Sequence, residues 1–355
     1  MNSGKRWFLA AASLSPGDGG IARVARLSAR TLMEGGSPPT MLCLGEAGAA
    51  SVGGLKPVSA KGSRVRFAAR CYRGALSHDW FIYDAVGTAR AHPGIPGLRR
   101  PYCVWIHGVE VWDYLSPARE RALRAAEFVL VNSQFTLARF QELHGPIDNA
   151  AVCRLATEED DAPAGAPAFD GPPTALLIGR ADRDNMRKGH IEVIDSWASV
   201  VKAIPDARLI MAGGGDGLDV VKDLVRASPA GDNIEVLGFV PEADMPALWR
   251  RSQVFVQPSW KEGFGLVYIE AMRYGLPVIA SLHDAGQEVN VDGVTGYNVD
   301  LGRSGDLADR LVGLFNDRDA AQAMGKAGRE RWRAEFRYSA FRDRLTDHLR
   351  RQKAI

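Results

Sequence analysis

The stretch EGFGLVYIEAMRYGLPVIA (residues 262–280) combines a strand end, a glycine-rich loop and a complete helix signal. An apolar run, VFVQPS, precedes it and predicts a buried strand. A helix is predicted over residues 266–274, because a glycine and then a proline follow it and end it. Glu262 therefore stands in the loop before the helix, and Glu270 stands about one turn inside it.

The loop between this strand and this helix has the composition of an anion site. Gly263 and Gly265 allow tight turns and the close approach of a ligand to the backbone. The free N–H groups of Leu266 and Val267, together with the helix dipole, favour a bound phosphate. Two alternatives stay open: ordinary helix-start acids, worth about 0.3–1 kcal/mol each, or the acid and base of a glycosidase. The glycine loop between the carboxylates favours the phosphate.

A second cationic element lies in LLIGRADRDNMRKGHIEVID (residues 176–195). Arg180 ends a predicted strand, and Lys188 stands just before the next predicted helix. A guanidinium fork and an ammonium point charge can grip one multivalent anion, although two solvated cations remain an alternative. The triplet Asp182–Asp184 has the form of a divalent-metal motif, but it stands among four cations. We interpret its acids as solvated loop residues and expect no metal.

Composition and length indicate a globular protein of two domains. The chain has 355 residues, 46% of them apolar and 24% charged, and a domain has roughly 100–200 residues. No apolar run approaches the roughly 18–20 residues of a membrane span. The cysteines form no C-x-x-C pair, which disfavours a zinc site or a disulfide framework and favours a cytoplasmic protein.

Apolar runs alternate with helical patterns in both halves, which predicts two parallel sheets with helices on both faces. The segment between the halves, residues 156–173, is acidic and rich in proline, glycine and alanine, so it is interpreted as a linker. We expect domains over residues 1–165 and 166–332, and a final helix over 333–355. The first run, WFLAAAS, faintly resembles a signal peptide but is better interpreted as a buried strand.

The first domain offers weaker candidates and an excess of positive charge. Gly19 and Gly20 follow the first strand, where a helix start can meet a phosphate; a simple tight turn is an equal alternative. His107 follows another strand at its carboxyl end, where ligands of parallel sheets bind; a structural histidine is the alternative. Residues 1–156 carry 19 lysines and arginines against 11 acids, which suits an anionic partner such as a membrane surface, or is simply uneven surface charge. No nucleic-acid motif is present, and we expect no such partner.

Together these motifs resemble a family 4 glycosyltransferase of the GT-B fold. The resemblance runs from GGIAR through WIHGVEVW, VNSQFT, IGRADRDNMRKG and LGFVPEADM to the stretch quoted first, whose glutamates match the family's E-x7-E signature. It implies two Rossmann-like domains facing each other across a cleft, with the final helix crossing back to the first domain. It also implies a retaining enzyme that uses a UDP- or GDP-sugar and needs neither a metal nor another cofactor.

The resemblance assigns a role to each candidate. The donor's diphosphate would be held by Arg180, Lys188 and the backbone of Gly265, Leu266 and Val267, with Gly19 and Gly20 approaching from the first domain. The donor sugar would contact Glu262, Phe264 and Gly265, and the ribose would contact Glu270. The base pocket would be formed by Phe239, Val240 and Pro258. Catalysis is expected of Glu262, Arg180, Lys188 and His107, the last near the anomeric carbon.

The acceptor is expected to be a glycan or lipid-linked glycan, in bacterial cell-surface polysaccharide or lipopolysaccharide assembly. The basic segment KGSRVRFAARCYRGAL, with Arg66, Arg70 and Arg73 at near-helical spacing, suits the anionic cytoplasmic face of a membrane; a solvated helix face is an equal alternative. Four other functions remain open: a non-catalytic nucleotide-sugar-binding protein, a nucleotide-sugar epimerase, a pyridoxal-phosphate phosphorylase, and a periplasmic type of sugar-binding protein.

Overall fold

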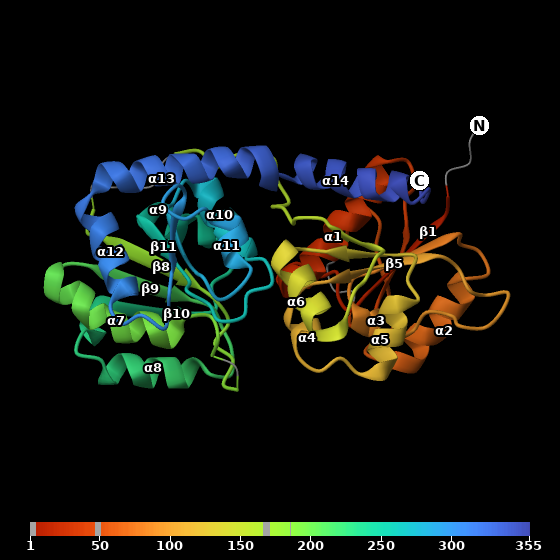
Figure 1. The fold of residues 1–355 in the computed structure, drawn as a ribbon, viewed down its shortest axis with the longest axis horizontal. Helices are drawn as coiled ribbons and strands as arrows, with labels where there is room; N and C mark the ends of the chain where they lie inside the picture. The colour runs from red at the N-terminus through yellow and green to blue at the C-terminus, as the bar shows by residue number, and fades with distance from the viewer. Residues whose placement is uncertain (1–4, 47–50, 166–170, 185) are drawn as a thin grey trace. The chain divides into compact units, whose positions relative to one another are not determined.

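The computed structural model describes residues 5–46, 51–165, 171–184 and 186–355. The chain forms two compact units, both drawn in Figure 1. Unit 1 comprises Met1–Glu158 and Tyr338–Ile355, and unit 2 comprises Glu159–Arg337. The first division lies inside the acidic segment 156–173, and the second falls at Arg337, whose backbone is extended between two helices.

Unit 1 is built on a parallel sheet, whose described strands follow the order β3-β2-β1-β4-β5-β6-β7. The strands are β1 (Trp7–Ala11), β2 (Thr40–Cys43), β3 (Val58–Ser59), β4 (Trp80–Tyr83), β5 (Tyr102–Ile106), β6 (Phe128–Val131) and β7 (Ala150–Val152). The helices are α1 (Gly19–Glu34), α2 (Arg64–Gly74), α3 (Val86–Ala89), α4 (Val109–Trp112), α5 (Pro117–Arg124), α6 (Gln134–His144) and α14 (Tyr338–Arg351). Strand β1 is buried along its whole length, which confirms the strand interpretation of the N-terminal run.

Unit 2 repeats this plan with the strand order β10-β9-β8-β11-β12-β13, also parallel throughout. The strands are β8 (Thr174–Ile178), β9 (Arg208–Ala212), β10 (Ile234–Gly238), β11 (Val254–Val256), β12 (Val278–Ser281) and β13 (Gly296–Val299). The helices are α7 (His190–Ala203), α8 (Leu218–Ala227), α9 (Met245–Arg251), α10 (Leu266–Tyr274), α11 (Gly286–Val289), α12 (Asp306–Asn316) and α13 (Arg318–Arg331). A 3-10 turn (Gly231–Asn233) precedes β10, and a π-helical turn (Trp332–Phe336) follows α13.

In both units the order of strands reverses beside the first strand of the sheet. In unit 2 the chain adds β9 and β10 on one side of β8, and then β11, β12 and β13 on the other. The loops after β8 and β11 therefore leave neighbouring strands in opposite directions, and parallel sheets commonly bind their ligands at such a point, at the carboxyl edge. The corresponding point in unit 1 lies between β1 and β4.

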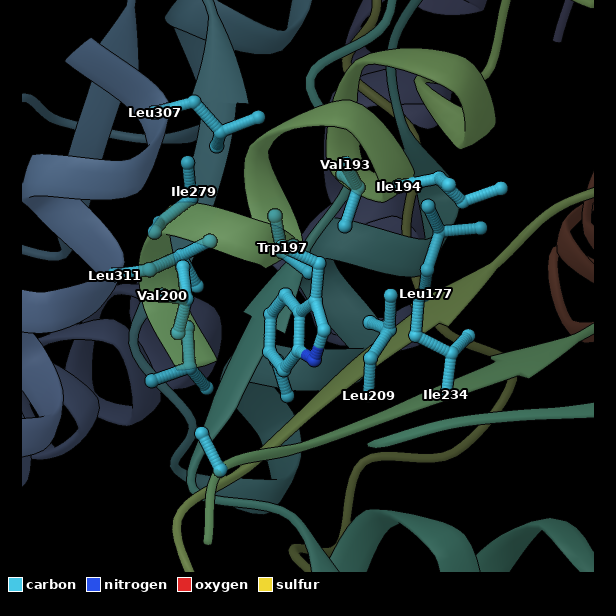
Figure 2. Close-up of a cluster of buried hydrophobic side chains, with 14 of the residues drawn as sticks. Leu177, Val193, Ile194, Trp197, Val200, Leu209, Ile234, Ile279, Leu307 and Leu311 are labelled. Carbon is cyan, nitrogen blue, oxygen red and sulfur yellow. The ribbon is translucent and has the colours of Figure 1, made fainter. Parts of the chain in front are cut away.

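The core of unit 2 is centred on Trp197 of α7, which is fully buried. Figure 2 shows its indole among aliphatic side chains of the sheet and of α12, including Leu177, Leu209 and Leu311. Replacing a tryptophan in such a site by alanine typically costs about 3–5 kcal/mol of stability. This dense packing fixes α7 on the sheet, and it thereby fixes the loop that leads into α7 from β8.

The C-terminal helix α14 belongs to unit 1. Its buried residues Tyr338, Phe341, Leu345 and Leu349 recur at helical spacing along one face. The Arg30 guanidinium of α1 lies 3.6 Å from the centre of the Tyr338 ring, and contacts between α1 and α14 make the two helices neighbours. A single amphipathic pattern had suggested one helix from residue 333, but helical structure stops at Phe336 and resumes at Tyr338.

Candidate active site

A partly buried ion pair joins the loop after β8 to the loop after β11 at the carboxyl edge of unit 2. Lys188 stands in the loop after β8, and its Nζ donates to Glu262 Oε2, in the loop after β11, at 2.5 Å. The Gln257 side-chain amide donates to the same oxygen at 3.4 Å. Only 33% of the Lys188 side chain and 15% of the Glu262 side chain are exposed. A cation and a carboxylate predicted to serve one ligand thus already contact each other.

The charge of Lys188 is secured by its surroundings. Burial opposes the charged form, but the carboxylates of Glu262, Asp284 and Asp182 outweigh it, so the pKa of Lys188 is raised. The lysine is therefore protonated at neutral pH. Gly189 allows this placement: its backbone is left-handed (φ 86°), and a Cβ there would lie 2.8 Å from the Pro258 carbonyl oxygen. A side chain at position 189 would push the two loops apart.

A second carboxylate, Asp284, lies behind Glu262 and is fully buried. Its Oδ2 accepts from the Ser259 hydroxyl and from the Glu262 backbone N–H, both at 2.8 Å. Its Oδ1 accepts from the Gly286 N–H at 2.9 Å. Burial and then the nearby charge of Glu262 raise the pKa of Asp284 to about 7, against the effect of these three hydrogen bonds.

Helix α10 starts where the sequence predicts an anion site. It spans Leu266–Tyr274, as expected, and both flanking glycines, Gly265 and Gly275, are left-handed. A Cβ at Gly265 would lie 2.1 Å from the Tyr268 ring, so position 265 requires glycine. No side chain in the described structure caps the start of α10. Its first amides are therefore available to a bound anion.

Other predicted donor-site residues lie on the same unit. The side chain of Phe264 is buried against Phe336, which leaves its backbone as the part able to meet a ligand. Glu270 lies on α10 and is half-buried. Near the carboxyl end of β10, Phe239 is 77% exposed and Val240 is half-buried. The start of the Phe239 side chain lies beside Gly214, where a Cβ would come 3.5 Å from the Phe239 Cβ.

Arg180 is presented differently from Lys188. Its side chain is 77% exposed, and its Nε and Nη2 donate to Asp182 Oδ1 at 3.1 and 2.6 Å. Arg183 in the same loop forms an ion pair with Asp219. Asp182 thus engages an arginine, as expected for a loop acid, and the structure holds Arg180 and Lys188 on two different carboxylates.

In unit 1, His107 is anchored through the main chain of Asp84. The His107 Nε2 lies 2.6 Å from the Asp84 carbonyl oxygen. Because a carbonyl only accepts, Nε2 carries a proton and donates it to this carbonyl. The Asp84 carboxylate is buried and accepts from the Ala12 N–H and the Thr88 hydroxyl, both at 2.7 Å. Burial raises the pKa of Asp84 to about 6.

Gly19 and Gly20 form the first turn of α1 and are exposed. Gly19 has a left-handed backbone (φ 83°), as a turn into a helix requires. The neighbouring acid, Asp18, caps no amide of α1, and its carboxylate accepts instead from the Ser13 hydroxyl. Trp105, two residues before His107 on β5, is fully buried in the core.

Sequence reasoning missed Asp284, Ser259 and Gln257 in unit 2 and Asp84 in unit 1. Each directly follows, or lies within three residues of, a buried strand at its carboxyl end. That position was the available signal, since ligands of parallel sheets bind at this edge. The pattern gave no sign that these side chains would be buried and hydrogen-bonded rather than solvated.

Comparison with known proteins places this site in a family. Residues 159–331, nearly all of unit 2, match the sequence family described as "Glycosyl transferases group 1". A GDP-mannose-dependent alpha-(1-6)-phosphatidylinositol monomannoside mannosyltransferase of Mycobacterium tuberculosis is 31% identical over 265 residues, or 69% of this chain and 68% of that protein. The chain belongs to the group 1 glycosyltransferases. It is therefore a glycosyltransferase, as the sequence led us to expect.

Solved structures confirm the fold class of this glycosyltransferase. Sucrose-phosphate synthase from Thermosynechococcus elongatus superposes with a TM-score of 0.82 at 19% identity, covering 99% of this chain and all of that one. HepE from Anabaena, solved with UDP and glucose, gives a TM-score of 0.75 at 18% identity, covering 98% and 100%. Two parallel α/β units of the GT-B type are thus established. In the described part of the chain, no helix is long and apolar enough to span a membrane.

Proposed function

We propose that this glycosyltransferase is a retaining, family 4 enzyme that moves a hexose from a GDP- or UDP-sugar to a hydroxyl of a lipid-linked acceptor. The observation that carries the proposal is the Lys188–Glu262 pair at the strand-order reversal of unit 2. It combines a secured cation, a carboxylate and an uncapped helix start at one sheet edge. Diphosphate and sugar hydroxyls are the chemistry that such a set of groups recognises.

Donor binding would rearrange this pair. The diphosphate would take hydrogen bonds from Lys188, from Arg180 and from the backbone of Gly265, Leu266 and Val267. Lys188 would then share its charge between the phosphate and Glu262, and Glu262 would gain capacity to accept from the donor sugar's hydroxyls. Glu270 would meet the ribose, and the base would lie near Phe239, Val240 and Pro258.

The reaction would depend on stabilising the leaving group. The bond from the sugar C1 to the phosphate oxygen breaks, its electron pair stays on the phosphate, and C1 gains a bond to the acceptor oxygen. The acceptor's proton passes to the departing phosphate. Lys188, Arg180 and the start of α10 offset the new charge, so no metal is needed in this scheme. Attack from the face of the leaving group retains the anomeric configuration, and His107 would lie near C1.

The relatives suggest which donor and acceptor to test first. The Mycobacterium tuberculosis relative is named for GDP-mannose and a phosphatidylinositol monomannoside. We therefore propose GDP-mannose as the donor and a phosphoinositide-based glycolipid as the acceptor, at the cytoplasmic face of a membrane. UDP-sugars and a polysaccharide or lipopolysaccharide precursor are the second choice.

A basic surface on α2 supports a lipid-linked acceptor. Lys61 and four arginines of α2 have no carboxylate partner in the described structure, and residues 61–77 contain no acid. Val65, between two of these arginines, is 80% exposed, and Leu76, just after α2, is 70% exposed. Cations at a helix start are disfavoured by the helix dipole unless an anion offsets them. An anionic lipid surface, with room for apolar tips among its headgroups, fits this combination.

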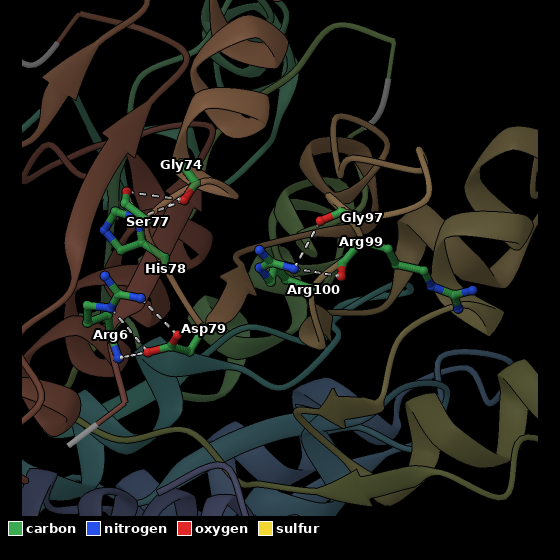
Figure 3. A network of polar contacts seen from close by, with 8 residues as sticks. All are labelled: Arg6, Gly74, Ser77, His78, Asp79, Gly97, Arg99 and Arg100. Atoms are coloured by element: carbon green, nitrogen blue, oxygen red, sulfur yellow. Dashed lines mark hydrogen bonds and ion pairs between the residues drawn. The ribbon is translucent and has the colours of Figure 1, made fainter. Parts of the chain in front are cut away.

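The C-terminal end of α2 is held rigidly in unit 1. Figure 3 shows the Gly74 carbonyl accepting from Ser77 and from the imidazole of His78, at 3.4 and 2.9 Å. The other ring nitrogen of His78 lies 2.8 Å from the Thr40 hydroxyl on β2. The next residue, Asp79, accepts hydrogen bonds from the backbone and the guanidinium of Arg6, just before β1, as Figure 3 also shows. The α2 arginines are thus carried on a fixed element.

The proposed function is tested by transfer from GDP-mannose or UDP-glucose to phosphatidylinositol monomannoside in vesicles, with phosphatidylinositol as a second acceptor. We expect mannosyl transfer that continues in EDTA and an anomeric configuration of the product, read by NMR, that matches the donor. Donor consumption without an acceptor would instead indicate an epimerase. Donor binding with no turnover on any acceptor would indicate a non-catalytic binding protein.

The surface on α2 is tested by sedimentation with vesicles of anionic or neutral lipid. Reversing Arg64 and Arg66 to Glu should reduce binding to anionic vesicles at least tenfold, since each cation near such a surface contributes about 1 kcal/mol. The matched control reverses two exposed cations of α13, Arg318 and Lys326, and should bind as the wild type does. Equal losses in both variants would contradict a specific α2 surface.

A further inference from the structure

We propose that Asp284 is a positioning residue for sugar transfer: its buried carboxylate fixes the main chain of Glu262 and so aims the Glu262 side chain. This inference rests on the proposed function and adds a group that lies outside the predicted donor site. Asp284 stands between β12 and α11, not on either loop that carries Lys188 and Glu262. It is the fully buried acid directly behind the Glu262 loop.

Two opposed hydrogen bonds clamp Glu262. Its N–H donates to Asp284 Oδ2 at 2.8 Å, and its carbonyl oxygen accepts from the Ala285 N–H at 3.0 Å. The same carboxylate oxygen takes the hydroxyl of Ser259, which in turn accepts from the Lys261 N–H at 3.2 Å. Segment 284–285 thus holds the main chain of the loop on both sides of the Glu262 Cα. With its main chain fixed in this way, the Glu262 side chain can move only by changing its own rotamer.

The side chains around Asp284 are tightly packed. A Cβ at Gly286 would lie 3.0 Å from Asp284 Oδ1 and 2.7 Å from the ring of Tyr268. Tyr268 is itself buried, and its hydroxyl donates to the Gln257 carbonyl oxygen at 2.7 Å. The start of α11, the Glu262 loop and α10 therefore meet at this carboxylate. A shift of about 1 Å at a reacting geometry can cost on the order of 10²-fold in rate.

The charge state of Asp284 matters because its partners are donors. The N–H groups of Glu262 and Gly286 can only donate, so a protonated carboxyl would turn its own O–H toward one of them or toward Ser259. The charged groups that face it are Glu262 from the β11 loop and Lys188 from the loop before α7, with the neutral phenol of Tyr268 on α10. The adjacent His283 faces away, toward Trp260 and Asp300.

The test compares Asp284→Asn with Asp306→Asn. Asp306 is a mostly buried acid of the same unit; its carboxylate accepts from the Asp300 backbone N–H and pairs with Arg310, and neither partner is a donor-site residue. We expect Asp284→Asn to lower kcat about 10–100-fold. GDP should bind equally or more tightly, because a negative charge near the diphosphate site is removed. Asp306→Asn should leave kcat and GDP binding unchanged.

The pH profile gives a readout that a purely structural role would not move. Wild-type kcat should rise with pH as Asp284 ionises near pH 7, and this rise should be absent in Asp284→Asn. Ser259→Ala removes one donor and keeps the others, so it should lower kcat about 3–10-fold with unchanged GDP affinity. It serves as the test if Asp284→Asn does not fold.

Three outcomes overturn the inference. They are wild-type kcat in Asp284→Asn, wild-type kcat in Ser259→Ala, and a parallel loss of GDP binding and transfer in a folded variant. Each presupposes a wild-type enzyme that binds GDP and transfers sugar. If the wild type binds neither GDP nor UDP, it is the proposed function that fails, and the inference falls with it.

Discussion

The two units share a strand order but differ in what stands at the carboxyl edge of each sheet. In unit 1 a buried acid, Asp84, ties the end of β4 to the residue after β1, and its carbonyl oxygen holds His107. In unit 2 a buried acid, Asp284, ties the end of β12 to the loop after β11, beside the Lys188–Glu262 pair. In both units a buried carboxylate joins two strand ends; in unit 1 the main chain of that acid holds His107, and in unit 2 the carboxylate holds the main chain of Glu262, the acid of the ion pair.

This difference suggests that the two units contribute differently to nucleotide binding and to sugar transfer. Unit 2 offers a secured lysine, an exposed arginine and an open helix start, which together favour an anionic ligand. The corresponding edge of unit 1 presents His107 and the exposed first turn of α1. We therefore expect nucleotide affinity to depend on unit 2, and the transfer step to depend on both.

The largest effect is expected from Lys188→Ala, which leaves Glu262 and Asp284 without their cation. Loss of one strong stabilising group in such a site costs about 10²–10³ in rate, and GDP affinity should fall as well. The matched control is Lys202→Ala at the exposed end of α7. Steady-state kinetics and calorimetry measure both effects. Near-normal transfer by Lys188→Ala would contradict the proposal that Lys188 stabilises the leaving diphosphate.

The next prediction tests whether unit 1 affects sugar transfer without affecting nucleotide binding. If His107 acts near C1 as proposed, His107→Ala should lower kcat about 10²-fold, the lower end of the typical range for loss of a group that acts on the reacting atoms, while the Kd for GDP stays within about twofold of wild type. Calorimetry and kinetics on the same preparation provide the comparison. A large loss of GDP affinity would show that His107 binds the nucleotide and that the division drawn above is wrong.

A smaller effect tests the backbone at the helix start. Gly265→Ala should destabilise the protein by about 1–3 kcal/mol, since its backbone is left-handed and a Cβ would meet Tyr268. Gly313→Ala, inside α12 with open space around it, should stabilise by about 0.5–1 kcal/mol. Chemical denaturation measures both, and equal changes in the two variants would contradict the tight fit at position 265.

The last comparison concerns how the two buried acids affect stability as the pH changes. The folded-state pKa values of Asp84 and Asp284 are raised to about 6 and about 7, so the native state holds these protons more tightly than the unfolded state. The stability that they contribute is present below pH 4 and is lost as pH rises, at most about 1.4 kcal/mol per pH unit for each group.

Thermal unfolding of wild type, Asp84→Asn and Asp284→Asn from pH 4 to 8 measures this loss. The wild type should lose stability relative to each asparagine variant as pH rises. The difference should level off near pH 6 for Asp84 and near pH 7 for Asp284. Two pH-independent differences would mean that neither carboxylate changes its pKa on folding.

Much of the fold was predictable because its signals are local. The bounds of α10 follow from two glycines that both adopt left-handed backbone, Gly265 and Gly275, and the buried strands appear as apolar runs. Strands β3, β7 and β13 do not stand out as apolar runs, because they are short or carry half-buried polar residues. The interruption at Arg337 was missed because the helical pattern continues across it.

The site was predictable in its residues but not in its contacts. Lys188 and Glu262 were chosen from separate motifs, and their ion pair depends on the close approach of Gly189 to Pro258. Asp284 left no trace in the pattern, because an acid after a strand is more often solvated than buried. Such contacts depend on packing between residues far apart in the sequence, and the spacing of residues along the chain does not reveal that packing.

The central claim is that unit 2 binds a nucleoside diphosphate through its own cations. Calorimetric titration of GDP and UDP tests it, with and without EDTA, on wild type, Arg180→Ala and the neighbouring exposed Arg183→Ala. The account predicts binding of one diphosphate, indifferent to EDTA, weakened in Arg180→Ala and unchanged in Arg183→Ala. Absence of binding to either nucleotide, or binding that requires a divalent metal, would contradict it.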